Sequence, residues 1–454
     1  MRTLLACAFI LAIATAAMAQ TFRGGIQGTV LDQTGAALPG VTVTVTSIGT
    51  GLTRMVQTDV NGNYFFSELP IGLYNVEATL QGYGNQLRKA VEVGAAASAR
   101  VYFEMKPGGL AESVEVVARA PLVDAARNDQ GGRIEGAQAN EIPLNGRDFV
   151  KLLSLVPGST ADPSGINDSP GSFGLFSING NRGRSNNYLL DGTDMNDGYR
   201  NLPAINEAGV FGTPATVLPI DAVAEFPVLS GVEAEYGRNA GAIVNIVTRS
   251  GTNAVTGSLY EYFRDDGMGA RNFFNAEPNP KNEFRNNQFG GALGGPFKRD
   301  RVFYFFSYEG QREHGGVPGP ARVPTADEIA AATAANGGVV NPVVRGLLQH
   351  GLWQAPNQAP DDNGDNLQAV TRFDNRVDSL IAKVDERIGG GDQLTVRYFF
   401  GDSDQSFPLG LLGGGVLPGY NTDTPTTVHL LSGSFTHVFT PRVLLEAPRA
   451  GPAA

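Results

Sequence analysis

The sequence predicts a mainly β protein in three consecutive parts: a small N-terminal β-sandwich, an α+β module, and antiparallel strands belonging to part of a transmembrane β-barrel. The chain has 59 glycines and 27 prolines in 454 residues. Most of its apolar residues stand in short alternating runs between turn residues, a pattern typical of strands. No apolar stretch after residue 20 reaches the roughly 20 residues that a membrane-spanning helix needs. Any entry into a membrane must therefore use a closed barrel, because only helices and closed barrels satisfy every backbone group in lipid.

The first 19 residues predict a secretory signal peptide. They combine a basic residue at Arg2, an apolar run over 4–14 and a small-residue cleavage pattern, Ala-Met-Ala, at 17–19. We expect the mature chain to begin at Gln20. Cleavage of the signal peptide removes Cys7, the only cysteine. Disulfides and thiolate chemistry are therefore excluded from the exported chain.

Charge and motif content exclude several classes of function. A formal net charge of −11 argues against a nucleic-acid partner, because affinity for the phosphate backbone comes from clustered Lys and Arg. The histidines lack zinc-site spacing, so we expect no enzyme activity, no metal site and no cofactor. Residues 361–366, DDNGDN, resemble a calcium loop without its glycine and final glutamate. A weak surface calcium site there is the less favoured alternative.

Residues 20–107 predict the β-sandwich. Short alternating runs such as VTVTVTS (41–47) are separated by turn residues such as Asn61-Gly62. Two stretches, GTVLDQTGAALPGVTVTVTSIGTG (28–51) and TDVNGNYFFSELPIGLYNVEATLQGY (58–83), resemble the carboxypeptidase-regulatory-like domain, a prealbumin-like sandwich. The resemblance implies the fold and leaves two roles open, contact with a glycan or service as a structural spacer.

Residues 108–122, GGLAESVEVVARAPL, predict a linker with one β-prone run at 113–118. This run has no partner nearby in the sequence, so it is suited to adding itself to the sheet edge of another protein. The alternative is an ordinary strand of the next domain.

Residues 123–253 predict the α+β module. Phe149, Leu152, Leu153 and Val156 recur at helical spacing before a Pro-Gly stop at 157–158. Two later stretches, FSINGNRGRSNNYLLDGTDMND (176–197) and LPIDAVAEFPVLSGVEAEYGRNAGAIVNIVTRSGTN (218–253), each join a strand to a glycine-rich loop and a second strand.

These stretches resemble the plug domain of TonB-dependent outer-membrane receptors. The second resembles the closing segment of the plug, and the first an earlier plug loop. Together with IPLNGRDF (142–149), they are most similar to the Oar-like subgroup. The plug-loop candidates are Arg147, Arg182, Arg184, Asp191, Tyr236, Arg238 and Arg249. Arg182, Arg184, Arg238 and Arg249 are either buried partners of wall carboxylates or solvated loop charges.

The same resemblance implies partners. Glu112, Ser113, Val114, Glu115, Val116, Val117 and Ala118 stand where the family keeps its TonB box, the segment that pairs with the inner-membrane energy transducer. The protein would then lie in the cell outer membrane, contact its lipid, and take up an extracellular solute such as a glycan or a peptide. The alternative function is an exported adhesion protein whose sandwich binds carbohydrate or matrix.

Residues 254–454 predict the N-terminal part of the barrel. In NQFGGALGGPFKRDRVFYFFSYEG (287–310), Val302, Tyr304, Phe306 and Tyr308 share one face, as expected at a lipid boundary. Taken alone, this run also fits a buried strand of a soluble protein. In QLTVRYFFGD (393–402), Arg397 stands on the polar, inward side. Residues 311–375 predict a long polar extracellular connection with a capping box at Thr325 to Glu328.

The length predicts an incomplete barrel. A receptor wall of about 22 strands of roughly 10 residues needs about 220 residues, and fewer than that follow Ser250. The final stretch, VLLEAPRAGPAA, also lacks a clear strand pattern. We therefore expect the chain to be a C-terminally truncated fragment.

Overall fold

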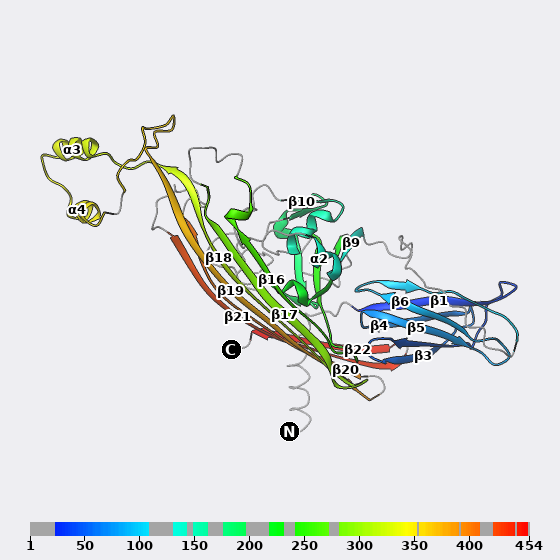
Figure 1. Cartoon of the computed structure of the whole chain (residues 1–454). Helices are drawn as coiled ribbons and strands as arrows, with labels where there is room; N and C mark the ends of the chain where they lie inside the picture. Colours follow the sequence, from blue (N-terminus) through cyan, green and yellow to red (C-terminus); the bar gives the residue numbers. More distant parts are fainter. Residues whose placement is uncertain are drawn as a thin grey trace, which may run out of the picture.

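A computed structural model describes most of the chain (Figure 1). The described residues are 23–108, 130–142, 149–161, 176–196, 218–230, 241–271, 281–351, 354–389, 392–408, 421–440 and 443–452. The segment 1–19 lies outside them.

The N-terminal strands form two facing sheets, which we call the sandwich. The strands are β1 (Gly24–Asp32), β2 (Thr42–Ser47), β3 (Thr53–Gln57), β4 (Asn63–Leu69), β5 (Gly72–Thr79), β6 (Gln86–Val93), β7 (Ser98–Arg100) and β8 (Phe103–Met105). One sheet has the order β4-β1-β7, with β8 also pairing β1, and the other has the order β3-β2-β5-β6. The predicted sandwich is therefore confirmed.

Alternation explains how the sandwich core forms. In β2 the valines Val43 and Val45 are buried, while the intervening threonines are only half-buried. Tyr74 and Phe103 fill the space between the sheets, and both are almost fully buried. The Asn61-Gly62 turn needs glycine because Gly62 has φ +75°. The period-2 pattern thus places one face of each sheet in a common core.

The middle of the chain forms a second unit, which we call the inner module. Its elements are β9 (Gln130–Glu135), α2 (Gly136–Glu141), η2 (Phe149–Leu155), β10 (Ser159–Ala161), β11 (Phe176–Ile178), η3 (Gly183–Ser185), β12 (Asn187–Leu190), β13 (Thr193–Asp194), η4 (Ile220–Ala222), β14 (Val223–Ser230) and β15 (Ile243–Thr248). Five strands make a sheet of order β13-β12-β15-β14-β9, and β10 pairs β11 separately. The helix predicted after Asp148 is a 3₁₀ helix, η2, whose Leu152 and Leu153 are buried.

The last described strands form a single meandering sheet, which we call the wall. They are β16 (Thr256–Asp265), β17 (Phe284–Lys298), β18 (Val302–Ala321), β19 (Leu367–Ile388), β20 (Asp392–Pro408), β21 (Asn421–Thr440) and β22 (Val443–Pro452), with η6 (Asp266–Met268) after β16. Each strand pairs antiparallel with the next. The mainly β fold class with a partial barrel wall is confirmed.

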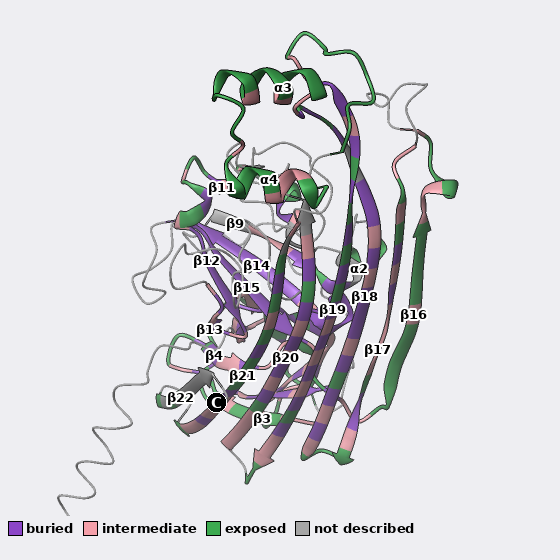
Figure 2. Cartoon of the chain, turned by 90° about the vertical axis from the view of Figure 1, so that its left-hand side faces the viewer, coloured by how far each residue is buried: buried purple, intermediate pink, exposed green. Residues whose placement is uncertain are grey.

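The wall has two chemically distinct faces, visible as alternating colours along its strands (Figure 2). In β18, Phe303 and Phe305 are buried and face the inner module, while Tyr304 and Phe306 point away. In β20 the buried positions include Arg397. The face assignments predicted from the 302–308 and 393–402 runs are therefore confirmed. A strand buried on both faces does not fit, because the outward side chains of Tyr304, Phe306 and Tyr308 are half-buried or exposed.

Two predicted features of the wall are wrong. Strands β18 and β19 continue into 311–375, pairing as far as Ala321 with Leu367, so the long connection covers only 322–366. The final stretch forms β22, paired with β21. Proline weakens the strand signal because it lacks a donor, yet a strand bonded on one side tolerates it.

The long connection carries two short helices, α3 (Ala326–Ala335) and α4 (Pro342–Gln349). The predicted capping box is present: the Thr325 hydroxyl accepts from the Glu328 N–H, and the Glu328 carboxylate accepts from the Thr325 N–H. No helix among the described residues is long and apolar enough to cross a membrane.

The inner module lies against the inward face of the wall. A shared apolar core joins Tyr188, Phe226 and Val244 of the inner module to Phe305 and Phe399 of the wall. This contact is the arrangement that a plugged barrel requires.

The sandwich core allows a matched stability test. Phe103→Ala should lower the free energy of unfolding of the sandwich by about 3–5 kcal/mol, because it removes a buried ring and leaves a cavity. Tyr102→Ala, which removes an adjacent ring that is 58% exposed, should cost far less. Hydrogen exchange of β1 in the full chain across a denaturant series measures both. Equal costs would contradict the assigned core.

Candidate functional site

The main site is a buried ion cluster where the inner module meets the wall. Asp191 directly follows β12 and has φ +45°, a backbone conformation that asparagine and aspartate tolerate better than most residues. The next residue, Gly192, donates its N–H to the Asn245 side chain at 2.9 Å. This tight turn between β12 and β13 directs the Asp191 carboxylate toward the wall.

Two wall cations meet that carboxylate. Arg397 of β20 forms an ion pair with Asp191 through Nη1, and its Nη2 donates to the Leu190 carbonyl at 2.9 Å. Lys383 of β19 places Nζ 3.9 Å from the same carboxylate. Thr248 of β15 donates to Asp191 from its N–H at 2.7 Å and from its hydroxyl at 2.5 Å. The cluster therefore ties β12 and β15 to two adjacent wall strands.

The electrostatics of the cluster favour the charged carboxylate. The side chains of Arg397 and Lys383 are only 3% and 8% exposed. Burial alone would raise the pKa of Asp191, but Lys383, Arg397 and the Thr248 donors together hold that pKa below its ordinary value. A buried carboxylate that stays ionised needs such partners, and their removal leaves uncompensated charge.

The charges at this interface are the reverse of a pairing between plug arginines and wall carboxylates. Arg182 and Arg184 lie at an exposed turn, so neither is buried against the wall. Arg249 is half-buried, and its Nε donates to the Val223 carbonyl at 3.1 Å. Asp191 supplies the interface charge, and the wall supplies the cations. Arg147, Tyr236, Arg238 and the whole segment 112–118 lie outside the described residues.

Sequence reasoning missed the role of the wall cations. The strand pattern predicts that Arg397 lies on the inward side, but it does not identify the partner of Arg397. Lys383 lies in DSLIAKVDERI (378–388), where a cation between apolar residues at an inward position was the available signal. Which carboxylate it meets depends on how the strands of the wall curve around the inner module.

A cavity of about 500 Å³ adjoins the cluster. Asp191, Lys383, Asp385 and Arg397 form part of its lining, together with residues of the sandwich. The cluster supplies charge and hydrogen bonds rather than reactive groups. No group of three or more His, Cys, Asp or Glu side chains that could hold a metal ion occurs in the described ranges.

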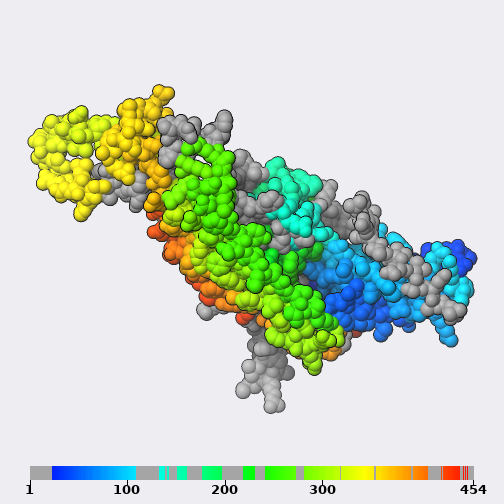
Figure 3. Space-filling view, in the orientation of Figure 1, coloured from blue at the N-terminus to red at the C-terminus, as the bar shows by residue number. Residues whose placement is uncertain are grey.

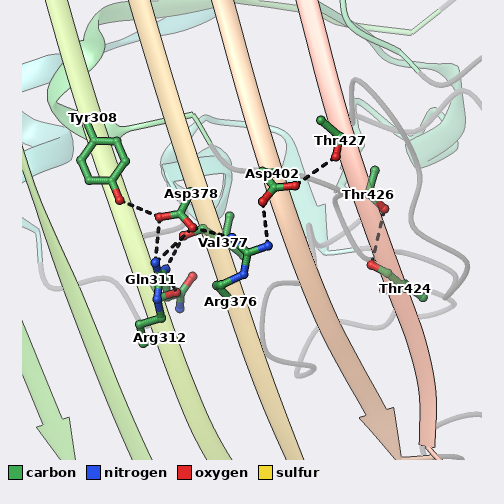
Figure 4. A network of polar contacts seen from close by, with 10 residues as sticks. All are labelled: Tyr308, Gln311, Arg312, Arg376, Val377, Asp378, Asp402, Thr424, Thr426 and Thr427. Carbon is green, nitrogen blue, oxygen red and sulfur yellow. Dashed lines mark hydrogen bonds and ion pairs between the residues drawn. The ribbon is translucent and has the colours of Figure 1, made fainter.

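A second polar network crosses the outward face of the wall (Figure 4). Asp378 accepts from the Tyr308 hydroxyl at 2.6 Å and from Arg312 at 2.9 and 3.1 Å. Arg376 links Asp378, at 2.8 Å, to Asp402, at 2.6 Å. Thr427 continues the network to β21 by donating to Asp402 at 3.0 Å. The charges in this network, which we call the outward ladder, are paired with one another across four strands.

Comparison with known proteins agrees with this architecture. The model of the outer membrane beta barrel domain matches residues 247–451, and that of the carboxypeptidase regulatory-like domain matches residues 25–106. The TonB-dependent transporter Oar of Myxococcus xanthus is 30% identical over 309 residues, which cover 65% of this chain. The chain is a homologue of an Oar-type TonB-dependent transporter. The predicted family resemblance is thus confirmed, although this homologue spans only 27% of the length of that relative.

Solved receptor structures are also similar to this chain. The ferric enterobactin receptor PfeA of Pseudomonas aeruginosa is 15% identical, with a TM-score of 0.42 over 68% of this chain and 39% of its own. The siderophore receptor PirA of Acinetobacter baumannii is 16% identical, with a TM-score of 0.33 over 67% of this chain and 44% of its own. TM-scores this low do not by themselves define a shared fold. The relatives are transporters and receptors rather than enzymes.

The ion cluster should determine how firmly the inner module is held. Asp191→Asn should destabilise the contact by about 3–5 kcal/mol, because Arg397 and Lys383 stay buried without a carboxylate. Asp385→Asn is the matched control, since its 2.7 Å bond to Thr395 stays within the wall. Denaturant-dependent hydrogen exchange of β12 and β15 in detergent-solubilised full chain measures both. Equal effects of the two substitutions would show that the ion cluster does not hold the inner module.

The cluster also has a defined pH dependence. Because the pKa of Asp191 is lowered from the ordinary 3.8, its stabilisation is complete above about pH 4 and is lost as the pH falls through the lowered value. The wild-type contact should therefore weaken at acidic pH with a step that Asp191→Asn lacks. The same exchange measurement across pH detects this step, and an identical profile in both proteins would contradict it.

Proposed function

We propose that the protein is a TonB-dependent outer-membrane receptor that takes up an extracellular solute, with the inner module as its plug and the wall as part of its barrel. The observation that carries the proposal is the buried polar contact through Asp191, Arg397 and Lys383. A plug must be held firmly and still be released. Charged hydrogen bonds suit this need because water can replace them when the module moves, whereas a dry apolar contact has no such substitute.

The outward face of the wall fits a bilayer. In β19, the outward residues between Asp378 and Glu386 are Leu380, Ala382 and Val384. At about 3.3 Å per residue this interval spans roughly 26 Å of strand, or about 20 Å of height at a tilt near 40°. That height is close to the roughly 25 Å apolar band of outer-membrane barrels. The paired charges of the outward ladder then lie at one boundary of the band.

The lengths of the connections support one orientation in the membrane. The connections over 299–301 and 389–391 are short, and the connection over 322–366 is long. Outer-membrane barrels carry short turns on the periplasmic side and long loops outside. The sandwich then lies in the periplasm, and α3 and α4 lie where a solute first arrives.

Energy for uptake would come from the inner-membrane transducer. The candidate TonB box, residues 112–118, stands in the chain between the sandwich and β9. Because the sandwich lies on the periplasmic side in this orientation, a segment that follows it in the chain begins on the side from which a transducer reaches. The signal over 1–19 supplies export, and the solute class, a glycan or a peptide, stays open.

A charge on the outward face tests membrane embedding. Ala382→Arg should destabilise the protein in lipid vesicles by about 2–4 kcal/mol, because it puts a cation at the middle of the apolar band. Val60→Arg, at a sandwich position that is 83% exposed, should have almost no effect. Denaturant unfolding from vesicles followed by protease resistance compares them. Similar small effects would place the wall outside lipid.

Deleting the box tests the partner and separates the two candidate functions. Removing 112–118 should abolish binding of the purified periplasmic domain of the host transducer to full chain in outer-membrane vesicles, because the pairing strand is lost. Removing 119–125 is the control of equal length. If transducer binding never occurs while the intact chain binds a glycan array, the adhesion function replaces the receptor.

A further inference from the structure

The sandwich is docked at the short-turn end of the wall, directly against the inner module (Figures 1 and 3). Its turn after β6 reaches the inner module, where the Ala95 N–H donates to the buried Glu225 carboxylate of β14. Beside this bond, Arg133 of β9 forms ion pairs with Glu92 of β6 at 2.9 Å and with Glu225 at 3.4 Å. One arginine therefore holds a carboxylate from each unit.

A small apolar patch completes this contact. Ala95, Ala96 and Ile71 of the sandwich pack against the inner module. The residues they cover are Leu189, Leu229, Ile243 and Val247, which come from β12, β14 and β15. The sandwich therefore shields these four apolar side chains of the inner sheet from solvent.

The sandwich also bonds to the rim of the wall. The Asn253 N–H, in the connection between β15 and β16, donates to the Gly49 carbonyl at 2.8 Å, and Arg387 of β19 donates to the Thr50 carbonyl at 3.2 Å. Arg23 donates to the Gln393 side chain at 2.8 Å. The sandwich thus bridges both units whose relative movement uptake would require.

This joint has the character of a separable interface. Its contacts are mainly hydrogen bonds and ion pairs, with one small apolar patch. The cavity of about 500 Å³ lies inside it, lined by residues from all three units. Permanent interfaces are more apolar and closely packed, whereas polar, cavity-containing contacts between domains open more readily.

In the sequence, the candidate box stands between the two units that meet at this joint. The sandwich ends near Pro107, and β9, which carries Arg133, begins at Gln130. Segment 112–118 lies between these points, so tension on it loads the sandwich at one end and β9 at the other. The Arg133 ion pairs join the same two bodies.

We propose that the sandwich is a displaceable lid on the periplasmic end of the lumen, with Arg133 as its latch. The lid must leave the inner module before that module can move within the wall. This proposal rests on the receptor function above, and it gives the sandwich a gating role in place of a passive spacer.

A disulfide tests whether the lid docks and whether it opens. A Cβ at Gly49 would lie 3.7 Å from the Cβ of Thr252, within the usual range for a disulfide. Gly49→Cys with Thr252→Cys, in a full chain carrying Cys7→Ser, should cross-link rapidly under mild oxidation in outer-membrane vesicles. Absence of the cross-link would overturn the docked lid.

Two latch variants test Arg133. Arg133→Gln removes the ion pairs, and Gly94→Val displaces the arginine, since a Cβ at Gly94 would lie 1.6 Å from Arg133 Nη1. Each should slow cross-linking about tenfold, the scale of a lost charge-assisted pair. The controls are Arg285→Gln, which removes an exposed ion pair to Asp265, and Gly269→Val, where space is open. Rates equal to the controls would overturn the latch.

Side-chain footprinting then tests the gate. With the cross-link formed and the transducer domain added, hydroxyl-radical labelling of Leu229 and Val247 should stay low, and it should rise several-fold after reduction. Unchanged labelling would overturn the lid as a gate. Only the footprinting depends on transducer binding. The cross-linking outcomes depend on neither the transducer nor Asp191, so the receptor function and the docked lid can fail separately.

Discussion

The structure depends on one constraint: a charged group of the inner module is buried against charged groups of the wall. Asp191 has two wall cations and the Thr248 donors around it, so the partly buried carboxylate stays ionised. An apolar contact of the same size could be as stable, but it would accept many relative positions. The ion cluster allows only one relative position of the two units, because each hydrogen-bond donor has a fixed direction. The inner module is thereby set in register with β19 and β20.

The wall supplies the cations of this contact on its inward face, while its outward face lies in a different environment. Along β19, Asp378 belongs to the outward ladder, and Lys383 reaches the inner module. The period-2 alternation of a strand lets neighbouring residues serve opposite environments. The outward charges are satisfied by each other, whereas the inward cations require a partner from another unit. The charges on the outward face of the wall are therefore paired within the wall. The cations on its inward face depend on the inner module for their partner.

The sandwich is a third folded unit in this packing arrangement. It is folded around its own core, yet it also contacts Glu225 in the inner module and Asn253 at the start of the wall. Its independent core lets it move as one unit without unfolding. Its polar contacts make such movement energetically modest. A domain that resembles a spacer in sequence thus acquires a position from which it can control access to the lumen.

The sequence alone determined the β class, the order of the three units, the faces of individual strands and the family resemblance, because alternation and turn residues are local and appear in any window of the chain. It assigned Arg397 to the inward side for this reason. Only the tertiary structure decided that Asp191, rather than Arg182 or Arg184, meets the wall, that Lys383 joins it, and that Arg133 links the sandwich to the inner module. Each of these contacts joins residues far apart in the chain. Their pairing depends on how three folded units pack, which no local pattern records.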